Sequence, residues 1–392
     1  MRDIEMRADL SVLIDARKLG HGGIGVYLRN LISGLIELKA AGAPLSISIL
    51  KQPGTLTPFY KEVIEYEEKA GLYSLSELFG LGRRISALNV DIFHSPHFTL
   101  PFGISVPTVA TIHDLIHINS PERWYYPYIA SPLVKSAARR ATKVVTVSEA
   151  TKAELLSLMG NSSIIRGKMV VIPNSLDESV IGAARPMGEL RRELHLYHPF
   201  VLAVVSTSKP HKGLNDLLRA WKEVRLWDTT CDLVVVGEGV ESSLHFQREE
   251  GIRVLGKVSD SVLYSLYKSC HLLAIPSLAE GFCLPALEAK RCGARLVTRP
   301  VPALKELVGP SDVVSRDFSI ASFTQALLSG IRSGLVSAEP PYDFERFQLS
   351  RVSEQMFHLY CEIAKRPQTS FASAVDSPLA VSNSPLSQQE VR

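Results

Sequence analysis

The sequence predicts an α/β protein with two doubly wound domains, each built on a parallel sheet covered by helices. Three observations support this prediction. The chain has 392 residues, a length typical of two domains. Short β-branched runs alternate with helical stretches, which is the pattern of repeated strand and helix units. The alternation stops near 175–198 and then restarts, so we expect a second domain after the first.

The first half of the chain contains the runs that we interpret as the strands of the first sheet. Each run is short, apolar and rich in β-branched residues, as expected of a buried strand. Helical patterns separate most of them, which favours parallel pairing. Together they predict a first domain over residues 1–180, with strands at 10–15, 45–50, 91–95, 108–114, 143–148 and 169–174.

The second half repeats the pattern after a predicted linker at 181–198. It predicts a second domain over 199–341, followed by a helical region at 342–365. The remaining residues, 366–392, are rich in Ser, Pro, Gln and Ala, a composition typical of disordered tails. The strands of the second sheet are expected at 200–206, 231–239, 252–259, 271–277 and 294–299.

Composition excludes several classes of function. The 43 basic and 40 acidic residues are spread along the chain and form no basic tract, which argues against a nucleic-acid partner. Five cysteines without a CxxC pair indicate a reducing compartment. The first 15 residues carry acids and lack a long apolar run, and no run reaches the roughly 18 residues of a membrane span. We therefore expect a cytoplasmic protein, with membrane contact at most peripheral and at the inner face.

Ligands of doubly wound sheets bind beyond the carboxyl ends of the strands, often against helix N-termini. In the first half, four glycines follow the first strand and open a helix, although an ordinary turn is an equal alternative. His113 and Asp114 end a later strand and are expected at one edge of a cleft. We interpret His94 and His97 as cleft lining too, since their spacing fits no common zinc signature. The glycines are Gly20, Gly22, Gly23 and Gly25.

In the second half, a basic loop follows the first strand. Lys209, His211 and Lys212 precede a helix that is expected to start near Asn215. Cations in this position can meet a phosphate in the cleft, whereas solvated loop lysines are the plain alternative.

The stretch "SLAEGFCLPALEAKRCGARLV" at 277–297 is the most informative part of the chain. Pro285 suits the first turn of a helix, and Gly281 suits a close approach to that turn. The helix start would leave backbone N–H groups unpaired and able to bind an anion, namely those around Phe282, Cys283 and Leu284.

Two glutamates flank this predicted anion site. Glu280 precedes the loop, and Glu288 is expected in the first turn of the helix. Carboxylates accept hydrogen bonds from hydroxyl groups, so the combination indicates a polyhydroxy ligand that carries phosphate, such as a nucleotide sugar. A helix cap with a solvated glutamate remains the alternative.

Together these motifs resemble the retaining glycosyltransferases of family four, which have the GT-B fold of two facing Rossmann-like domains. The resemblance runs from about residue 10 to residue 360, and its most specific part is the Glu-x7-Glu pair. The closest general likeness is to bacterial polysaccharide and lipopolysaccharide mannosyl- and glucosyltransferases. The motifs occur in the family's order: "GGIGVYLRNL", "ATIHDL", "VVTVSEATKAEL", "VIPNSLD", "STSKPHKGLNDLLRA", "LVVVGEG" and "VLGKVSDSVLYSLYKSCHLLAIPSLAEGFCLPALEAKRCG".

The resemblance implies roles for individual residues. Glu280 would contact hydroxyls of the transferred sugar, Glu288 the ribose, Lys212 the diphosphate, and His113 the sugar near its C6 hydroxyl. The catalytic residues would be Glu280, His113 and Lys212. Separately, the segment "INSPERWYYPYIASPLVKSAARR" at 118–140 combines aromatic and basic residues, so Asp114, Tyr125 and Tyr126 are expected to bind the acceptor, although an ordinary packed loop is at least an equal alternative. The donor would contact Gly22, Gly23, Ser206, Lys212, Gly281, Phe282, Cys283, Leu284 and Glu288.

The implied reaction moves a sugar, with mannose as first guess, from a nucleoside diphosphate to a hydroxyl of a glycan or lipid-linked acceptor, with retention of configuration. The chain contains no DxD pair, so no metal cofactor is expected. Two departures from the family pattern stand near the donor, because Cys283 replaces a common glycine and His211 replaces a second cation. Two alternatives remain open: a GT-B enzyme of the nucleotide-sugar epimerase type, and a nucleotide-sugar binding module without catalysis.

Overall fold

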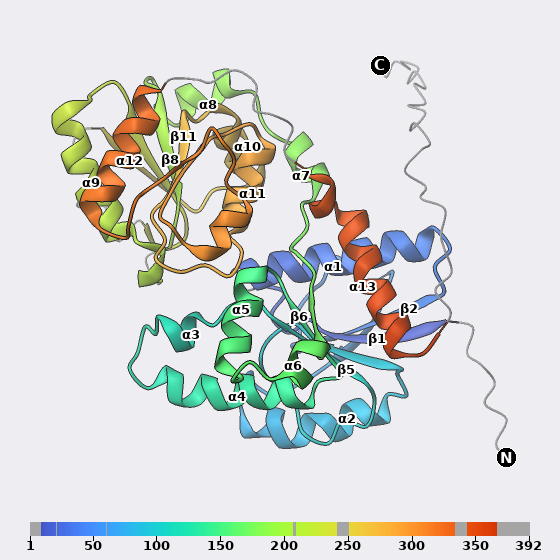
Figure 1. Cartoon of the computed structure of the whole chain (residues 1–392). Coiled ribbons are helices and arrows are strands. Elements are labelled where there is room, and N and C mark those ends of the chain that lie inside the picture. The colour runs from blue at the N-terminus through green and yellow to red at the C-terminus, as the bar shows by residue number, and fades with distance from the viewer. Residues whose placement is uncertain are drawn as a thin grey trace, which may run out of the picture.

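The computed structural model describes residues 9–20, 22–59, 61–206, 209–240, 251–333 and 343–366. It contains two α/β domains, one above the other in the view of Figure 1. Nearly all of the predicted tail lies outside the described residues. Among the helices that the structure describes, none combines the length and the apolar character needed to cross a bilayer.

The first domain is built on a seven-stranded sheet in which neighbouring strands pair in parallel. Its strand order is β3-β2-β1-β4-β5-β6-β7. Every residue of β4 and β5 is buried, because helices cover both faces of the sheet. The strands are β1 (Leu10–Asp15), β2 (Leu45–Lys51), β3 (Ile64–Glu67), β4 (Ile92–Ser95), β5 (Thr108–Ile112), β6 (Lys143–Thr146) and β7 (Met169–Val171).

The second domain repeats this topology with a six-stranded parallel sheet in the order β10-β9-β8-β11-β12-β13. Both sheets thus have the strand order of a doubly wound dinucleotide-binding fold, in which the chain leaves the central strand toward opposite edges. The strands are β8 (Phe200–Val204), β9 (Asp232–Val236), β10 (Ile252–Gly256), β11 (Leu272–Ile275), β12 (Leu296–Thr298) and β13 (Val313–Val314).

Helices cover both sheets, and shorter helical turns lie in the loops. The helices of the first domain are α1 (Gly22–Ala40), α2 (Gly82–Ala87), α3 (Ile116–Asn119), α4 (Tyr126–Arg140), α5 (Glu149–Leu158) and α6 (Ser163–Lys168). The later helices are α7 (Glu178–Gly182), α8 (Met187–Glu193), α9 (Leu214–Trp227), α10 (Asp260–Ser269), α11 (Leu284–Arg291), α12 (Ile320–Arg332) and α13 (Leu349–Ile363). The turns are η1 (Glu77–Leu81), η2 (Pro210–Lys212), η4 (Pro302–Glu306) and η5 (Glu345–Phe347).

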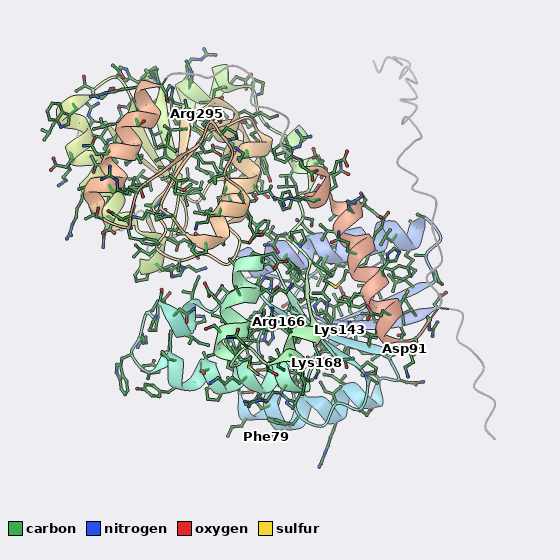
Figure 2. The ribbon with its side chains drawn as sticks, viewed as in Figure 1. Phe79, Asp91, Lys143, Arg166, Lys168 and Arg295 are labelled. Atoms are coloured by element: carbon green, nitrogen blue, oxygen red, sulfur yellow. The ribbon has the colours of Figure 1, made fainter. Side chains whose placement is uncertain are left out.

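The last helix returns to the first domain. In Figure 1, α13 lies beside α1, and a Cβ added to Gly34 of α1 would stand 1.9 Å from the Ser353 hydroxyl oxygen of α13. An ion pair of 2.8 Å joins Glu362 of α13 to Lys143 at the start of β6, which Figure 2 labels. The C-terminal helical region is therefore a structural part of the first domain.

The predicted strands match the sheet strands closely. The run at 10–15 coincides with β1, and the other runs start within two residues of the strands they predict. Two edge strands escaped prediction. β3 is partly exposed and not apolar along its length, and β13 has only two residues, so neither carries the apolar signal of a buried strand.

Candidate active site

The second sheet has its topological switch point between β8 and β11, because the chain continues from β8 toward one edge and from β11 toward the other. The loops after these two strands meet there. Lys212 follows β8, and its Nζ lies 2.7 and 2.8 Å from the two carboxylate oxygens of Glu280, which follows β11. The Ser277 hydroxyl donates a further hydrogen bond of 2.6 Å to Glu280.

This pair keeps Lys212 charged although the side chain is largely buried. Burial by itself would lower the pKa of Lys212, but the Glu280 carboxylate outweighs it, so the pKa of Lys212 is raised. The side chain of Glu280 is 5% exposed and that of Lys212 is 22% exposed, so part of the lysine side chain remains accessible to solvent. The structure thus brings two of the predicted site residues, Lys212 and Glu280, into direct contact.

Glycine shapes the loop that carries Lys212. Gly213 has φ of 71°, a left-handed conformation that favours glycine. A Cβ at Gly213 would also stand 2.2 Å from the carbonyl oxygen of Pro276, just after β11. The "HKG" sequence therefore lets the Lys212 loop pack directly on the end of the neighbouring strand.

The predicted helix start at 282–285 is present as the N-terminus of α11. Leu284 begins the helix, Pro285 lies in its first turn, and no side chain caps it. Cys283 precedes the helix with φ of 75°, which strains a residue that has a Cβ. One detail of the prediction was wrong. Glu288 is the fifth residue of α11 and lies in its second turn, because the helix begins at Leu284 rather than later.

Glu288 has different surroundings from Glu280. It is partly buried, and the Tyr267 hydroxyl donates to its Oε2 at 3.0 Å. Burial raises the pKa of Glu288 to about 7, although hydrogen bonds from Tyr267 and Tyr264 oppose the rise. Near neutral pH this carboxyl group can therefore gain or lose a proton when a ligand arrives.

Gly281, between the two glutamates, lies against the first domain. The Ser148 hydroxyl donates to its carbonyl oxygen at 2.6 Å, and the Thr151 hydroxyl lies 3.2 Å from the same oxygen. A Cβ at Gly281 would stand 1.9 Å from the carbonyl oxygen of His113. The loop with the glutamates thus touches the residues that end β5, as predicted for facing domains.

The imidazole ring of His113, near the contact between the two domains, is fixed by two neighbours and favours its neutral form. Its Nε2 donates to the carbonyl oxygen of Pro96 at 3.0 Å, and the Tyr27 ring meets it edge to face with centroids 4.7 Å apart. Burial lowers the pKa of His113 to about 4, against the opposing effect of Asp114. Asp114 accepts a hydrogen bond of 3.0 Å from the backbone of Ile116 and so caps the next turn.

The other predicted residues have less defined surroundings. Gly22 and Gly23 are exposed at the start of α1, and Gly22 has φ of 46°. Ser206 follows β8 and is partly buried. Tyr125 and Tyr126 are partly buried at the start of α4, with ring centroids 5.1 Å apart. Their roles at the donor and acceptor stay predictions.

His211 lies where the loop of Lys212 faces the first domain. Burial, followed by the charge of Lys212, lowers its pKa. Its Nδ1 makes no hydrogen bond among the described residues and lies 3.9 Å from the Glu122 carboxylate of the first domain. The lowered pKa of His211 favours its neutral form beside the charged Lys212.

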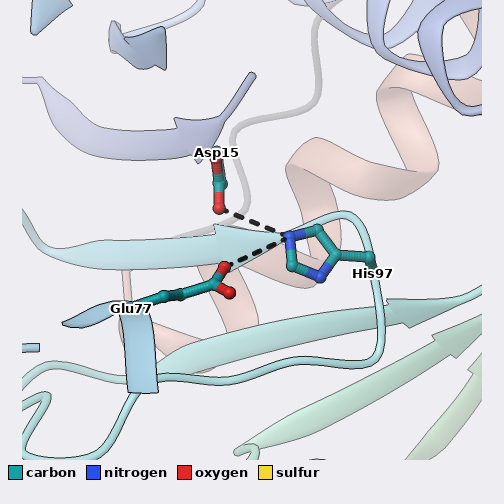
Figure 3. Close-up of side chains that lie close together, drawn as sticks. All are labelled: Asp15, Glu77 and His97. Atoms are coloured by element: carbon teal, nitrogen blue, oxygen red, sulfur yellow. Dashed lines mark ion pairs between the residues drawn. The ribbon is translucent and has the colours of Figure 1, made fainter. Parts of the chain in front are cut away.

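The first sheet has a matching switch point between β1 and β4, and a buried ion cluster fills it (Figure 3). Arg17 bonds Asp15 at 2.6 and 2.8 Å and Glu77 at 2.6 Å. The His97 Nε2 lies 3.5 Å from Asp15 and 4.0 Å from Glu77. Asp15, Glu77 and His97 could together approach a metal ion, but the Arg17 guanidinium already neutralises both carboxylates.

The interpretation of His94 and His97 as cleft-lining residues was wrong. His94 and His97 are 0% and 2% exposed and belong to the core rather than the cleft lining. His94 bonds Tyr360 of α13 at 2.6 Å and Thr111 of β5 at 2.7 Å. A strand-end histidine in sequence does not reveal that a distant C-terminal helix will cover it.

Sequence reasoning also missed residues that complete the site. Ser148 and Thr151 join the domains, Ser277 holds Glu280, and Tyr267 holds Glu288. Ser148 and Thr151 stand in "VVTVSEATKAEL", where Ser148 also caps α5 and so looks purely structural.

The two α/β domains and their contact define a GT-B architecture, and comparisons with solved structures agree on this fold. A solved structure of HepE from Anabaena, in complex with UDP and glucose, has a TM-score of 0.68 at 20% identity and covers 89% of this chain and 99% of that one. The lipopolysaccharide outer core galactosyltransferase WaaB, in its apo form, has a TM-score of 0.63 at 15% identity and covers 90% of this chain and 98% of that one.

Family models identify the group. "Glycosyltransferase Family 4" matches residues 21–180, and "Glycosyl transferases group 1" matches residues 198–332. The chain therefore belongs to the family-four glycosyltransferases, as the sequence motifs predicted.

Two curated relatives are mannosyltransferases. The O-antigen chain mannosyltransferase B of Escherichia coli is 28% identical over 259 residues, which cover 62% of this chain and 65% of that protein. The MMP alpha-(1->4)-mannosyltransferase of Mycolicibacterium hassiacum is 28% identical over 226 residues, which cover 54% and 52%. The chain thus matches less than two thirds of the length of either relative.

Proposed function

We propose that this protein transfers a hexosyl group from a nucleoside diphosphate sugar to a hydroxyl of a glycan or lipid-linked acceptor, in the synthesis of a cell-envelope polysaccharide. Mannose is the first candidate for the sugar, because both relatives described above are mannosyltransferases. The observation that carries the proposal is the Lys212–Glu280 pair, which lies at the switch point with the N-terminus of α11 in the same loop region.

The arrangement suits a leaving diphosphate. Negative charge grows on the phosphate oxygens as the bond to the sugar breaks, and Lys212 and the N–H groups at the start of α11 would stabilise it electrostatically. Glu280 would accept hydrogen bonds from sugar hydroxyls, since its oxygens have acceptor capacity beyond the contacts with Lys212 and Ser277. Glu288 would accept hydrogen bonds from the ribose.

The proposed chemistry retains the anomeric configuration. The bond between the anomeric carbon and the diphosphate breaks, and the acceptor oxygen bonds to the same face of that carbon. The acceptor proton passes to the departing phosphate oxygen, so no protein nucleophile is required. His113, neutral and fixed by Pro96, would position the sugar rather than exchange protons near neutral pH.

A donor screen in excess EDTA tests the proposal. Common nucleotide sugars are incubated with the protein and with mannose-terminated glycosides, and nucleoside diphosphate release and the anomeric NMR signal of the product are followed. We expect release from at least one donor, with retention, in the presence of the chelator. Activity that needs Mn²⁺ would contradict the metal-free mechanism, and an inverted anomeric signal would contradict retention.

The same screen separates the alternatives. Conversion of the donor to a free epimerised nucleotide sugar without acceptor would identify an epimerase. Binding of nucleoside diphosphate by calorimetry, without turnover of any donor, would identify a binding module.

A further inference from the structure

An exposed row of aromatic rings runs from the candidate active site along the first domain. Neighbouring ring centroids along the row lie 5.7, 6.2, 5.4, 5.1 and 5.9 Å apart, so the row is continuous. We call it the aromatic track, and it consists, in spatial order, of Tyr73, Phe98, His117, Tyr126, Tyr125 and Trp124.

Every ring of the aromatic track is at least partly open to solvent, which is unusual for so many adjoining aromatic side chains. Tyr73 is 46% exposed at one end and Trp124 is 80% exposed at the other. The part of the track from His117 to Trp124 lies on α3, on the start of α4 and on the loop between them, which Figure 1 shows at one end of the first domain, whereas Tyr73 and Phe98 come from the loops before η1 and after β4. Phe98 also packs against the core of the first domain, but the other five rings belong to none of the hydrophobic clusters of the described residues.

One end of the aromatic track lies near His113, and the other end faces His211 of the second domain. At one end, Phe98 stands two residues after Pro96, whose carbonyl oxygen accepts a hydrogen bond of 3.0 Å from the Nε2 of His113. At the other end, Glu122, two residues before Trp124, lies 3.9 Å from His211, the neighbour of Lys212. An occupant of the track would therefore be continuous with the donor site.

The chemistry of the rings favours a carbohydrate occupant. Five of the six rings carry a polar atom, and only Phe98 is purely apolar. Sugar rings have apolar C–H faces and hydroxyl edges, and tyrosine and tryptophan present both an apolar face and a hydrogen-bonding group. A surface built to enter a lipid bilayer would instead expose mainly aliphatic and phenyl groups.

We propose that the aromatic track binds the acceptor as an oligosaccharide of several units, with the reactive hydroxyl at the candidate active site and the preceding sugars stacked toward Trp124. This proposal rests on the proposed function, since it places the acceptor of that reaction. It makes acceptor length, rather than a single terminal sugar, the determinant of recognition.

Calorimetric titrations without any donor test the track directly. The probes are oligosaccharide ladders of one to six units from α-mannan, α-glucan and α-galactan. For at least one ladder, wild-type affinity should rise roughly tenfold from one unit to four, because each additional stacked sugar contributes a few-fold. Trp124→Ala should remove most of this rise and leave the binding of nucleoside diphosphate unchanged.

Trp227→Ala is the matched control. Trp227 is 71% exposed at the end of α9 in the second domain. The control variant therefore loses a comparably exposed indole that lies outside the aromatic track. The control should keep the full dependence on length. Both tryptophans are exposed, so we expect both variants to fold.

Three results would overturn the track as a glycan site. Affinity could be independent of length in every ladder, or the rise could survive in Trp124→Ala. Alternatively, Trp124→Ala could lose binding to phosphatidylglycerol vesicles while its oligosaccharide binding stays intact, which would identify a membrane surface. Failure of the proposed function is a separate result, because it is the absence of nucleoside diphosphate release from every donor in the wild type.

Discussion

The two sheets have the same strand order, yet their switch points are filled in opposite ways. In the first domain, Arg17 bonds Asp15, Glu77 and the carbonyl oxygen of Ala70, and the side chains of all three charged residues are at most 2% exposed. In the second domain, Lys212 is 22% exposed and bonds the carboxylate of Glu280.

The comparison shows that topology alone does not identify a ligand site. A guanidinium shared between two buried carboxylates has no group left for a ligand, and its hydrogen bonds lower the pKa of Asp15 well below the ordinary value despite burial. The partly exposed ammonium group of Lys212 can instead exchange the Glu280 carboxylate for a phosphate group of a ligand. We therefore assign stability to the first switch point and chemistry to the second.

The largest expected effect is on stability. Arg17→Met leaves Asp15 and Glu77 buried without a counter-charge, so the free energy of unfolding should fall by about 3–5 kcal/mol. Urea unfolding followed by circular dichroism measures this. Arg84→Met is the control, because Arg84 is 49% exposed in its pair with Glu68 and should cost less than about 1 kcal/mol. If both variants are equally stable, the first switch point is not a structural cluster.

The next effect is on rate. Lys212→Ala removes the cation that meets the leaving diphosphate, so kcat/KM of the folded variant should fall by the equivalent of about 2–4 kcal/mol. Initial rates of nucleoside diphosphate release measure this. Lys209→Ala, an exposed lysine of the same loop, should be nearly unchanged. Equal rates for the two variants would remove Lys212 from the site.

A smaller effect separates the two glutamates. Glu288→Gln should weaken the binding of nucleoside diphosphate by about 1 kcal/mol, because an amide accepts ribose hydrogen bonds less strongly than a carboxylate. Glu280→Gln should not weaken this binding, since it releases Lys212 from its competing partner, but it should suppress transfer. Calorimetry with nucleoside diphosphate alone decides the matter. Equal losses in the two variants would show that the assignment of roles is wrong.

The smallest effect depends on pH. Burial raises the pKa of Glu288 from 4.5 to about 7, so the protonated form prevails in the folded protein below that pH. Stability that comes from holding this proton is present at low pH and is lost as pH rises from 4.5 toward 7. Nucleotide binding has the opposite trend, because the ionised carboxylate is the better acceptor for ribose hydroxyls.

The affinity of the wild type for nucleoside diphosphate, relative to Glu288→Gln, should therefore rise by at most roughly tenfold between about pH 6 and 8. The ratio cancels the titration of the phosphate itself. A ratio that is flat across this range would show that Glu288 does not change its charge on binding.

Local signals predicted most of the fold. β1 coincides with its predicted run, and α9 begins one residue before the predicted start at Asn215, because apolar periodicity and turn residues act within a few neighbours. The resemblance implied that Glu280 and Lys212 belong to one site, but the direct ion pair between them was not predicted.

Contacts between distant segments could not be predicted in the same way. Tyr360 covers His94 from 266 residues away, and Ser148 reaches Gly281 across 133 residues. Neither pair has a local pattern that distinguishes it from a strand-end histidine or a helix cap. The turn that holds Glu288 was misplaced for a simpler reason, because helix starts in sequence are uncertain by a few residues.

The carbonyl oxygen of Gly281 gives the domain arrangement a thermodynamic consequence. Its hydrogen bonds to Ser148 and Thr151 exist only while the two domains touch, and the same peptide segment carries Glu280. The proposed donor contact of Glu280 would therefore link donor binding to domain closure, and each would then favour the other by the same free energy. A side chain at position 281 would collide with the carbonyl oxygen of His113 and keep the two domains apart. Such a variant should still bind the donor through its second domain but should not close.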